Sequence, residues 1–263
     1  MAKAVISSTY DDKYLFFLPI VTYCWNKLGV DVICFLPIEK NDKDYAKIKL
    51  AMEYCNNYKL SVYQFAAPEH KEATYAQCSR LYAACLDLPE DEILVTSDVD
   101  MAVFKLPPHE TRFTIFGYDL VPQEQYPMCY ASASVKEWRS AFCQERMYQQ
   151  CLDNLVGVIE CEHFRGNQWS LDQSELFRKL TLPRIINIVP RARPYTQFAL
   201  NRYDRDDAFL LDRLSLDTID YHMPRPGYLE QNFNQILTVL KFHYPLDDFD
   251  WLINYREQYI SLL

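Results

Sequence analysis

Apolar and polar positions alternate in two different periods over the first hundred residues. Four short runs rich in β-branched and aromatic residues have the length of strands, and they cover 3–8, 31–36, 60–66 and 92–97. Between these runs, apolar residues recur at helical spacing over 12–28, 42–58 and 72–88. Pro19 must either kink the first of these helices or mark a later start. The alternation predicts a mostly parallel sheet with helices on both faces, which binds ligands at the carboxyl ends of its strands.

The pattern loosens after residue 100. Further strand candidates lie at 101–105, 112–117, 127–131 and 185–189, and helices are predicted near 134–154, 170–180, 228–241 and 247–260. We expect this half to extend the sheet with mixed strand directions. The fold class predicted is therefore α/β, and no repeat or linker divides the chain into separate domains.

Composition narrows the class of protein. The 263 residues are 49% hydrophobic, which is enough for a large core. No stretch approaches the roughly 18 to 20 consecutive apolar residues of a membrane span, and residues 1–12 lack the apolar core of a signal peptide, so we expect a soluble, cytoplasmic protein. The nine cysteines form no CxxC pair, and they fall in apolar patterns that predict buried thiols without disulfides.

The net charge and the glycine content argue against several common ways of binding phosphate groups. The net charge of −9 opposes binding to nucleic acid. It does not exclude a local basic strip, which the pairs Arg191/Arg193 and Arg202/Arg205 would form. The five glycines form neither a dinucleotide-binding fingerprint nor a phosphate-binding loop of the P-loop kind. If the chain binds phosphates, a cation has to hold them.

A carboxylate pair supplies a candidate for holding that cation. The chain has four Asp-x-Asp triplets, at 42–44, 98–100, 204–206 and 248–250. Only Asp98 and Asp100 directly follow a buried apolar strand, residues 93–96. Adjacent carboxylates repel each other unless a cation or a shared proton relieves them, and oxygen ligands suit Mn²⁺ or Mg²⁺. Such an ion would bridge the two phosphates of a nucleotide diphosphate. The alternative is a strand-end pair that caps a turn or a helix.

The order of four motifs resembles the GT-A glycosyltransferases, most closely those of family 8. The motifs are Ser7 to Asp12 after the first strand, the helix Ala73 to Leu81, the triplet Ser97-Asp98-Val99-Asp100, and the late stretch His222-Met223-Pro224-Arg225-Pro226-Gly227. The resemblance implies a single GT-A domain over 1–263, a Rossmann-like sheet with a mixed acceptor half. Residues 1–100 would form the half that binds the nucleotide-sugar, and 101–263 the acceptor half and the C-terminal helices.

The resemblance also implies roles for particular residues. It assigns a metal site to Asp98, Asp100 and His222, with His243 as the competing histidine. It assigns donor binding to Ser8, Thr9, Tyr14, Arg80, Ser97, Asp98, Val99, Arg225 and Gly227. Arg225 has the charge to clamp phosphate, and Gly227 permits a close approach of the backbone. For Arg80 the alternative is a surface salt bridge.

The reacting sugar and the acceptor are assigned in the same way. Asp172 and Gln173 match the family's Asp-Gln pair at the reacting sugar, and Tyr130, Ala131 and Trp169 fall where these enzymes form the acceptor pocket. In an inverting enzyme Asp172 would deprotonate the acceptor hydroxyl. In a retaining enzyme Asp172 or Gln173 would instead stabilise positive charge beneath the sugar. The structural alternative for Asp172 is stabilisation of a helix N-terminus.

The sequence thus predicts a metal-dependent glycosyltransferase that uses Mn²⁺ or Mg²⁺. Its donor would be a nucleotide-diphosphate sugar, with UDP favoured, and its acceptor a hydroxyl group, expected on a glycan. One alternative is a nucleotidyltransferase acting on a sugar phosphate, but those enzymes usually carry a Gly-rich basic loop after the first strand, and residues 7–12 contain neither Gly nor Lys. Another is a non-catalytic binding protein of the same fold.

Overall fold

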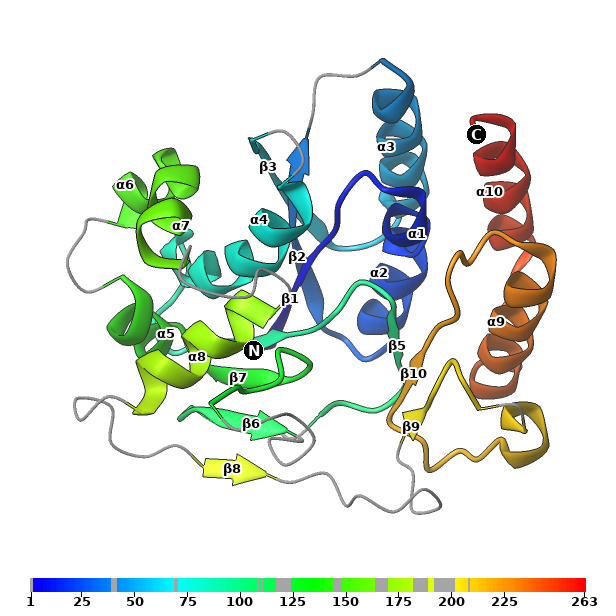
Figure 1. Ribbon diagram of the computed structural model, residues 1–263. Helices are drawn as coiled ribbons and strands as arrows, with labels where there is room; N and C mark the ends of the chain where they lie inside the picture. Colours follow the sequence, from blue (N-terminus) through cyan, green and yellow to red (C-terminus); the bar gives the residue numbers. More distant parts are fainter. Residues whose placement is uncertain are drawn as a thin grey trace.

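A sheet of seven strands forms the centre of the part of the chain that the structure describes (Figure 1). The computed structural model describes residues 2–38, 42–68, 71–107, 109, 111–116, 124–143, 148–163, 170–181, 189–191, 202–207 and 209–263. The strand order is β3-β2-β1-β4-β7-β6-β8. The bounds are β1 Ala2–Ser7, β2 Asp31–Ile38, β3 Leu60–Ala66, β4 Ile93–Thr96, β6 Thr114–Phe116, β7 Ala131–Ser134 and β8 Val189–Arg191.

The sheet is parallel in its first half and mixed in its second. β2 pairs in parallel with both β3 and β1, and β1 pairs in parallel with β4. β7 then runs antiparallel to β4 and to β6, and β8 pairs in parallel with β6. The predicted α/β architecture, with a mostly parallel sheet and a mixed second half, is confirmed.

Alternating side chains of the central strands pack into two separate hydrophobic cores, one on each face of the sheet. On β1, Ala4 and Ile6 pack into one core while Val5 packs into the other, as the two-residue period of a strand requires. All three side chains are fully buried. A strand that is apolar on both faces needs helices on both faces, and this is what the chain supplies.

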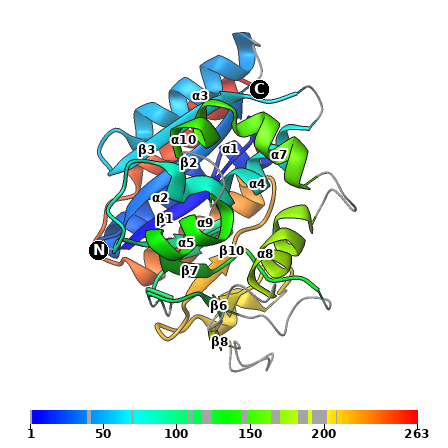
Figure 2. The same ribbon diagram turned by 90° about the vertical axis from the view of Figure 1, so that its left-hand side faces the viewer.

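The helices divide between these two faces. One core contains side chains from α1 Asp12–Leu15, α2 Leu18–Lys27, α3 Asp42–Cys55, α9 Glu230–His243 and α10 Asp250–Ser261. The other contains side chains from α4 Glu72–Ser79, the 3₁₀ helix η1 Arg80–Cys85, α5 Val135–Phe142, α6 Tyr148–Asp153, α7 Leu155–His163 and α8 Leu171–Thr181. Figure 2 views the molecule from the side covered by this second group.

A small second sheet connects the late part of the chain to the end of β4. Its order is β5-β10-β9, with β5 at Met101–Val103, β9 at Arg202–Tyr203 and β10 at Asp220–His222. β10 pairs antiparallel with β5, and β9 pairs in parallel with β10. A further 3₁₀ helix, η4 at Leu210–Arg213, lies between β9 and β10 in the chain.

Several predicted boundaries differ from those observed. The first helix breaks into α1 and α2, and Pro19 lies in the first turn of α2, where its missing N–H costs no hydrogen bond. The strand predicted at 127–131 is wrong for 127–130, because these residues form a loop and β7 begins only at Ala131. The strand predicted at 185–189 falls outside the described residues apart from its last residue, which begins β8.

None of the described helices is both long enough and apolar enough to cross a membrane. Eight of the nine cysteines are described with their side chains, none of the eight forms a disulfide, and seven are buried. The prediction of buried thiols is confirmed for those seven. Cys129 is half-buried at a polar pocket.

Candidate functional site

A cavity of about 410 Å³ opens at the carboxyl ends of β1 and β4. These strands are parallel neighbours, so the residues that follow them meet at one edge of the sheet. Ser8 and Thr9 follow β1, and Asp98 and Asp100 follow β4; all four line the cavity. The backbone N–H of Ser97 donates to the carbonyl of Val5 at 2.9 Å. This bond holds the carboxyl ends of β1 and β4 together.

The second sheet brings His222 to the same edge. In the antiparallel ladder His222 lies opposite Met101, the residue after Asp100. The N–H of Met223 donates to the carbonyl of Asp100 at 2.9 Å. The imidazole Nε2 of His222 therefore lies 3.4 Å from Oδ2 of Asp100, although 121 residues separate the two in sequence.

Most of the residues assigned to donor and metal binding line this one cavity. Those that line it are Ser8, Thr9, Tyr14, Arg80, Asp98, Val99, Asp100, Asp172, Gln173, His222 and Arg225. Ser97, Gly227, Tyr130 and Ala131 are buried and do not line it. Trp169 lies outside the described residues.

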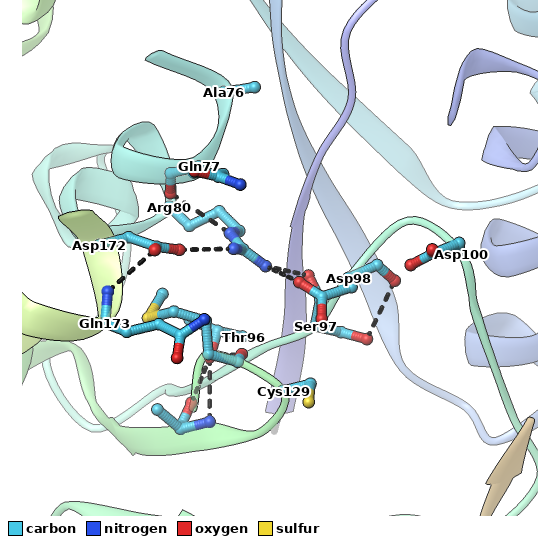
Figure 3. Close-up of polar contacts among 12 residues, drawn as sticks. Ala76, Gln77, Arg80, Thr96, Ser97, Asp98, Asp100, Cys129, Asp172 and Gln173 are labelled. Carbon is cyan, nitrogen blue, oxygen red and sulfur yellow. Dashed lines mark hydrogen bonds and ion pairs between the residues drawn. The ribbon is translucent and has the colours of Figure 1, made fainter. Parts of the chain in front are cut away.

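Arg80 bridges two carboxylates at the base of the cavity (Figure 3). Its Nη1 donates to Asp98 Oδ1 at 2.6 Å and to the carbonyl of Ser97 at 2.8 Å, and its Nη2 donates to Asp172 Oδ2 at 2.7 Å. The Arg80 side chain is only 4% exposed, and its charge-assisted bond to Asp172 is shielded from water, whereas the Asp98 side chain is 39% exposed. Burial raises the pKa of Asp98, but Arg80 more than offsets this and leaves that pKa below its usual range.

Asp172 is the most enclosed carboxylate of the cavity. Its side chain is 2% exposed, and besides the bond from Arg80 its Oδ1 accepts the backbone N–H of Gln173 at 2.9 Å. Burial raises the pKa of Asp172, and the Arg80 guanidinium offsets the rise only in part. The position near the start of α8 also places Asp172 at the positive end of the helix dipole.

One oxygen of Asp100 lies close to two guanidiniums and an imidazole. Its Oδ2 lies 3.1 Å from Nη2 of Arg205, 3.4 Å from Nε2 of His222 and 3.5 Å from Nε of Arg225. Burial nevertheless raises the pKa of Asp100, because desolvation and the nearby Asp98 oppose its charged form. The carboxylate therefore gains from any further cation that approaches it.

The donor set suits a divalent cation in chemistry and is only partly assembled in geometry. Two carboxylates and an imidazole are ligands that Mn²⁺ accepts. Ligands bound at about 2.1 Å and at right angles lie about 3 Å apart, which is close to the separation of His222 and Asp100. Asp98 is instead turned toward Arg80. Within the described residues, no three His, Cys, Asp or Glu side chains are gathered closely enough to hold an ion as they stand.

The competing histidine lies elsewhere in the fold. His243 stacks on Phe104, with ring centroids 3.7 Å apart and planes 4° apart, and it does not line the cavity. Burial, together with the charge of Lys105, lowers its pKa to about 4. His243 is therefore a neutral packing residue at neutral pH, and of the two histidines only His222 reaches the carboxylates.

Gly227 is held by packing against aromatic rings. A Cβ at this position would lie 2.4 Å from Phe17 and 2.9 Å from Phe16, two fully buried side chains. We predict that Gly227→Ala lowers the free energy of unfolding by about 1 to 3 kcal/mol, the usual cost of an overpacked core. Chemical denaturation checks this, and an unchanged unfolding midpoint would contradict it.

The loop before β7 is fixed by buried polar groups. The hydroxyl of Thr96 donates to the carbonyl of Met128 at 2.5 Å and accepts the N–H of Ala131 at 2.9 Å. Tyr130 donates its hydroxyl to the fully buried Asp220 at 2.8 Å. Tyr130 and Ala131 therefore anchor the loop, while Pro127, Met128 and Cys129 face the cavity.

Ten further residues of the lining have no individual role assigned to them from the sequence. Among them are Gln77, Phe116, Cys129, Arg202 and Arg205. Arg202 and Arg205 come from the charged stretch around β9, where no strand was predicted and no periodicity marks a site. Arg202 bonds Asp220 at 2.8 Å across the β9–β10 pair, a contact that follows only once the two strands lie side by side. Arg191 contributes to β8 with its backbone, and Arg193 lies outside the described residues.

Comparison with known proteins finds similarity only among solved structures. No protein-family model matches the chain, and no curated protein sequence matches it. The galactosyltransferase LgtC, solved with donor and acceptor sugar analogues, aligns with a TM-score of 0.48 and 8% identity over 94% of this chain and 97% of its own. GlyE from Streptococcus pneumoniae TIGR4 aligns with a TM-score of 0.48 and 13% identity, over 99% of this chain and 64% of its own.

A third structure, the PaToxG glycosyltransferase, aligns with a TM-score of 0.38 and 10% identity over 99% of this chain and 84% of its own. Each of the three neighbours is a glycosyltransferase. These scores and identities are low.

Proposed function

We propose that the chain is a metal-dependent glycosyltransferase of the GT-A type. It would transfer a sugar from a nucleotide-diphosphate sugar, with UDP favoured, to a hydroxyl group of a glycan acceptor. The observation that carries the proposal is the cavity at the carboxyl ends of β1 and β4, which gathers three carboxylates, four arginines and one histidine. A diphosphate and a sugar together need this combination of cation-holding and anion-holding groups.

The positions of the charged side chains in the cavity support a nucleotide-sugar donor that lies across it. Asp98, Asp100 and His222 would hold Mn²⁺ or Mg²⁺, which supplies positive charge to the departing diphosphate. Arg225 lies at the same end, and its Nη1 is hydrogen-bonded to the hydroxyl of Tyr14. That bond fixes the direction of a guanidinium that is 29% exposed and can still reach a phosphate. Ser8 and Thr9 line the wall where a base or ribose would lie.

Asp172 supports the sugar end of this arrangement. Both of its oxygens already accept hydrogen bonds, one from Arg80 and one from the N–H of Gln173. A carboxylate held in this way is better suited to stabilise positive charge at the sugar than to turn and carry a proton away. The amide of Gln173 lines the cavity beside it. The geometry thus favours the retaining alternative, in which a donor phosphate oxygen takes the acceptor proton.

The acceptor would enter past the loop that precedes β7. Pro127, Met128 and Cys129 line the cavity, and Tyr130 is anchored behind them by Asp220. An apolar and small-residue wall of this kind suits the face of a sugar ring. The acceptor roles predicted for Tyr130 and Ala131 would then be indirect, through the position of this loop.

The proposal is tested by release of free nucleotide diphosphate from a panel of UDP-, GDP- and TDP-sugars, each with Mn²⁺ and with EDTA. We expect one donor to be hydrolysed slowly with Mn²⁺ and to be spared with EDTA, and a glycan acceptor to increase the rate. Release of pyrophosphate from a nucleoside triphosphate and a sugar phosphate would instead indicate a nucleotidyltransferase. If stably folded protein releases no nucleotide diphosphate from any donor, the chain would instead be a non-catalytic binding protein.

A further inference from the structure

Arg205 contacts Asp100 and His222, two of the three groups that the proposed function assigns to a metal ion. Its Nη2 lies 3.1 Å from Oδ2 of Asp100, and its Nε lies 3.4 Å from Nδ1 of His222. The guanidinium thus contacts both groups from the residue stretch that follows β9. Its side chain is only 14% exposed, so its charge is largely removed from water.

One nitrogen of this guanidinium is left without a partner. Nη1 of Arg205 is buried and has no hydrogen-bond partner among the described residues. A buried donor on a charged group is costly to leave unsatisfied, and such groups in native proteins usually have a reason to be there. Because Arg205 lines the cavity, a ligand that brings oxygen atoms into the cavity is a natural partner for this nitrogen.

The arginines of the cavity differ in how fully their charge is matched. Arg80 contacts two carboxylates, Asp98 and Asp172. Arg202 contacts the fully buried Asp220 through two nitrogens. Arg205 and Arg225 differ from both, because they share the single Oδ2 atom of Asp100. The charges of these two guanidiniums are less completely neutralised by carboxylates, so they are better able to bind an anion.

Asp204 adds a second reason to regard this segment as part of the site. Its Oδ1 lies 3.6 Å from Nδ1 of His222, on the side of the ring away from Asp100. A carboxylate that accepts the Nδ1 proton leaves the Nε2 lone pair for a metal ion. Arg205 competes for the same Nδ1 atom as a donor, so its departure would favour the metal-binding tautomer.

We propose that Arg205 is a resident cation of the cavity with two positions. Without ligand it neutralises Asp100 and contacts His222. When a divalent cation and a nucleotide diphosphate bind, it leaves Asp100 and donates to the diphosphate. This inference rests on the proposed function, since it assumes a diphosphate and a metal ion in this cavity. It assigns Arg205 as a donor-binding residue in addition to Arg225.

The two positions predict two opposite effects of one substitution. Arg205→Gln removes the charge that competes with Mn²⁺ for Asp100, so the affinity for Mn²⁺ alone should rise about tenfold, and the affinity for UDP at saturating Mn²⁺ should fall about tenfold. Mn²⁺ binding is measured from the electron paramagnetic resonance signal of the free ion, and UDP binding by calorimetry. Arg205→Lys keeps the positive charge and should return both affinities toward those of the unsubstituted protein.

The matched control is Arg213→Gln in η4. Arg213 is 42% exposed, lies 3.5 Å from Asp207 and does not line the cavity, so both affinities should be unchanged. If Arg205→Gln alters neither affinity, or lowers both together as general damage would, the inference is wrong while binding by the unsubstituted protein still supports the proposed function. If the unsubstituted protein binds neither Mn²⁺ nor UDP, both the inference and the proposed function are wrong.

Discussion

Asp100→Asn should reduce metal-dependent release of nucleotide diphosphate by at least about a hundredfold, because a metal ligand contributes several kcal/mol and each 1.36 kcal/mol is a factor of ten in rate. Asn keeps the shape of Asp100 and removes its charge, which burial already disfavours. We therefore expect the free energy of unfolding to change by only about 1 kcal/mol. Rate assays and chemical denaturation on the same preparation separate the two effects.

The control for this variant comes from another triplet of the same pattern. Asp250 ends the triplet 248–250, lies exposed in the first turn of α10 and does not line the cavity. Asp250→Asn should leave the rate unchanged. Equal losses in the two variants, or an Asp100→Asn protein that keeps its metal-dependent rate, would contradict the assignment of the metal site.

The second large effect is expected on stability, at the buried ion pair behind the cavity. Asp220 is fully buried and accepts bonds from Arg202 Nε at 2.8 Å and from the Tyr130 hydroxyl at 2.8 Å. Asp220→Ala would leave a guanidinium and a phenol without this partner, at a cost of about 3 to 5 kcal/mol. For a chain of this length that corresponds to a fall of roughly 6 to 20 °C in Tm, measurable by calorimetry.

An exposed ion pair close by provides the comparison. Lys105 and Asp217 lie 3.1 Å apart, but the Asp217 side chain is 95% exposed. Asp217→Ala should therefore cost less than about 1 kcal/mol. If the two variants have similar stability, the pair of Arg202 and Asp220 does not stabilise the fold as its burial suggests, and the anchoring of the Tyr130 loop would need another explanation.

The first half of the fold was predictable because apolar residues recur there at clear strand and helix spacings. Three of the first four strands, β1, β2 and β4, contain runs of buried residues, and the helices between the strands are long enough to show their spacing. The single helix predicted near 134–154 is observed as two helices, α5 and α6, and α7, which begins one residue after α6, was missed. β9 and β10 were missed because strands of two and three residues are too short to show a period.

The site was predictable only where a local pattern carries it. Asp98 and Asp100 follow a buried strand, so their place at the sheet edge follows from the topology of parallel strands. The approach of His222 depends on a ladder between β5 and β10, which no periodicity of either segment indicates, and its place at the site was expected only from the resemblance of the stretch 222–227. Arg205 and the bridge from Arg80 to Asp172 likewise join segments far apart in the chain. Packing decides such contacts, and a single sequence does not record it.

The most direct test of the account is a calorimetric titration of UDP into the unsubstituted protein, once with Mn²⁺ and once with EDTA, repeated with Asp100→Asn. The account predicts saturable binding that requires Mn²⁺ and is lost in Asp100→Asn, because Asp100 is proposed to hold the ion that would bind the diphosphate. Binding of equal strength with EDTA, or undiminished binding by Asp100→Asn, would contradict it.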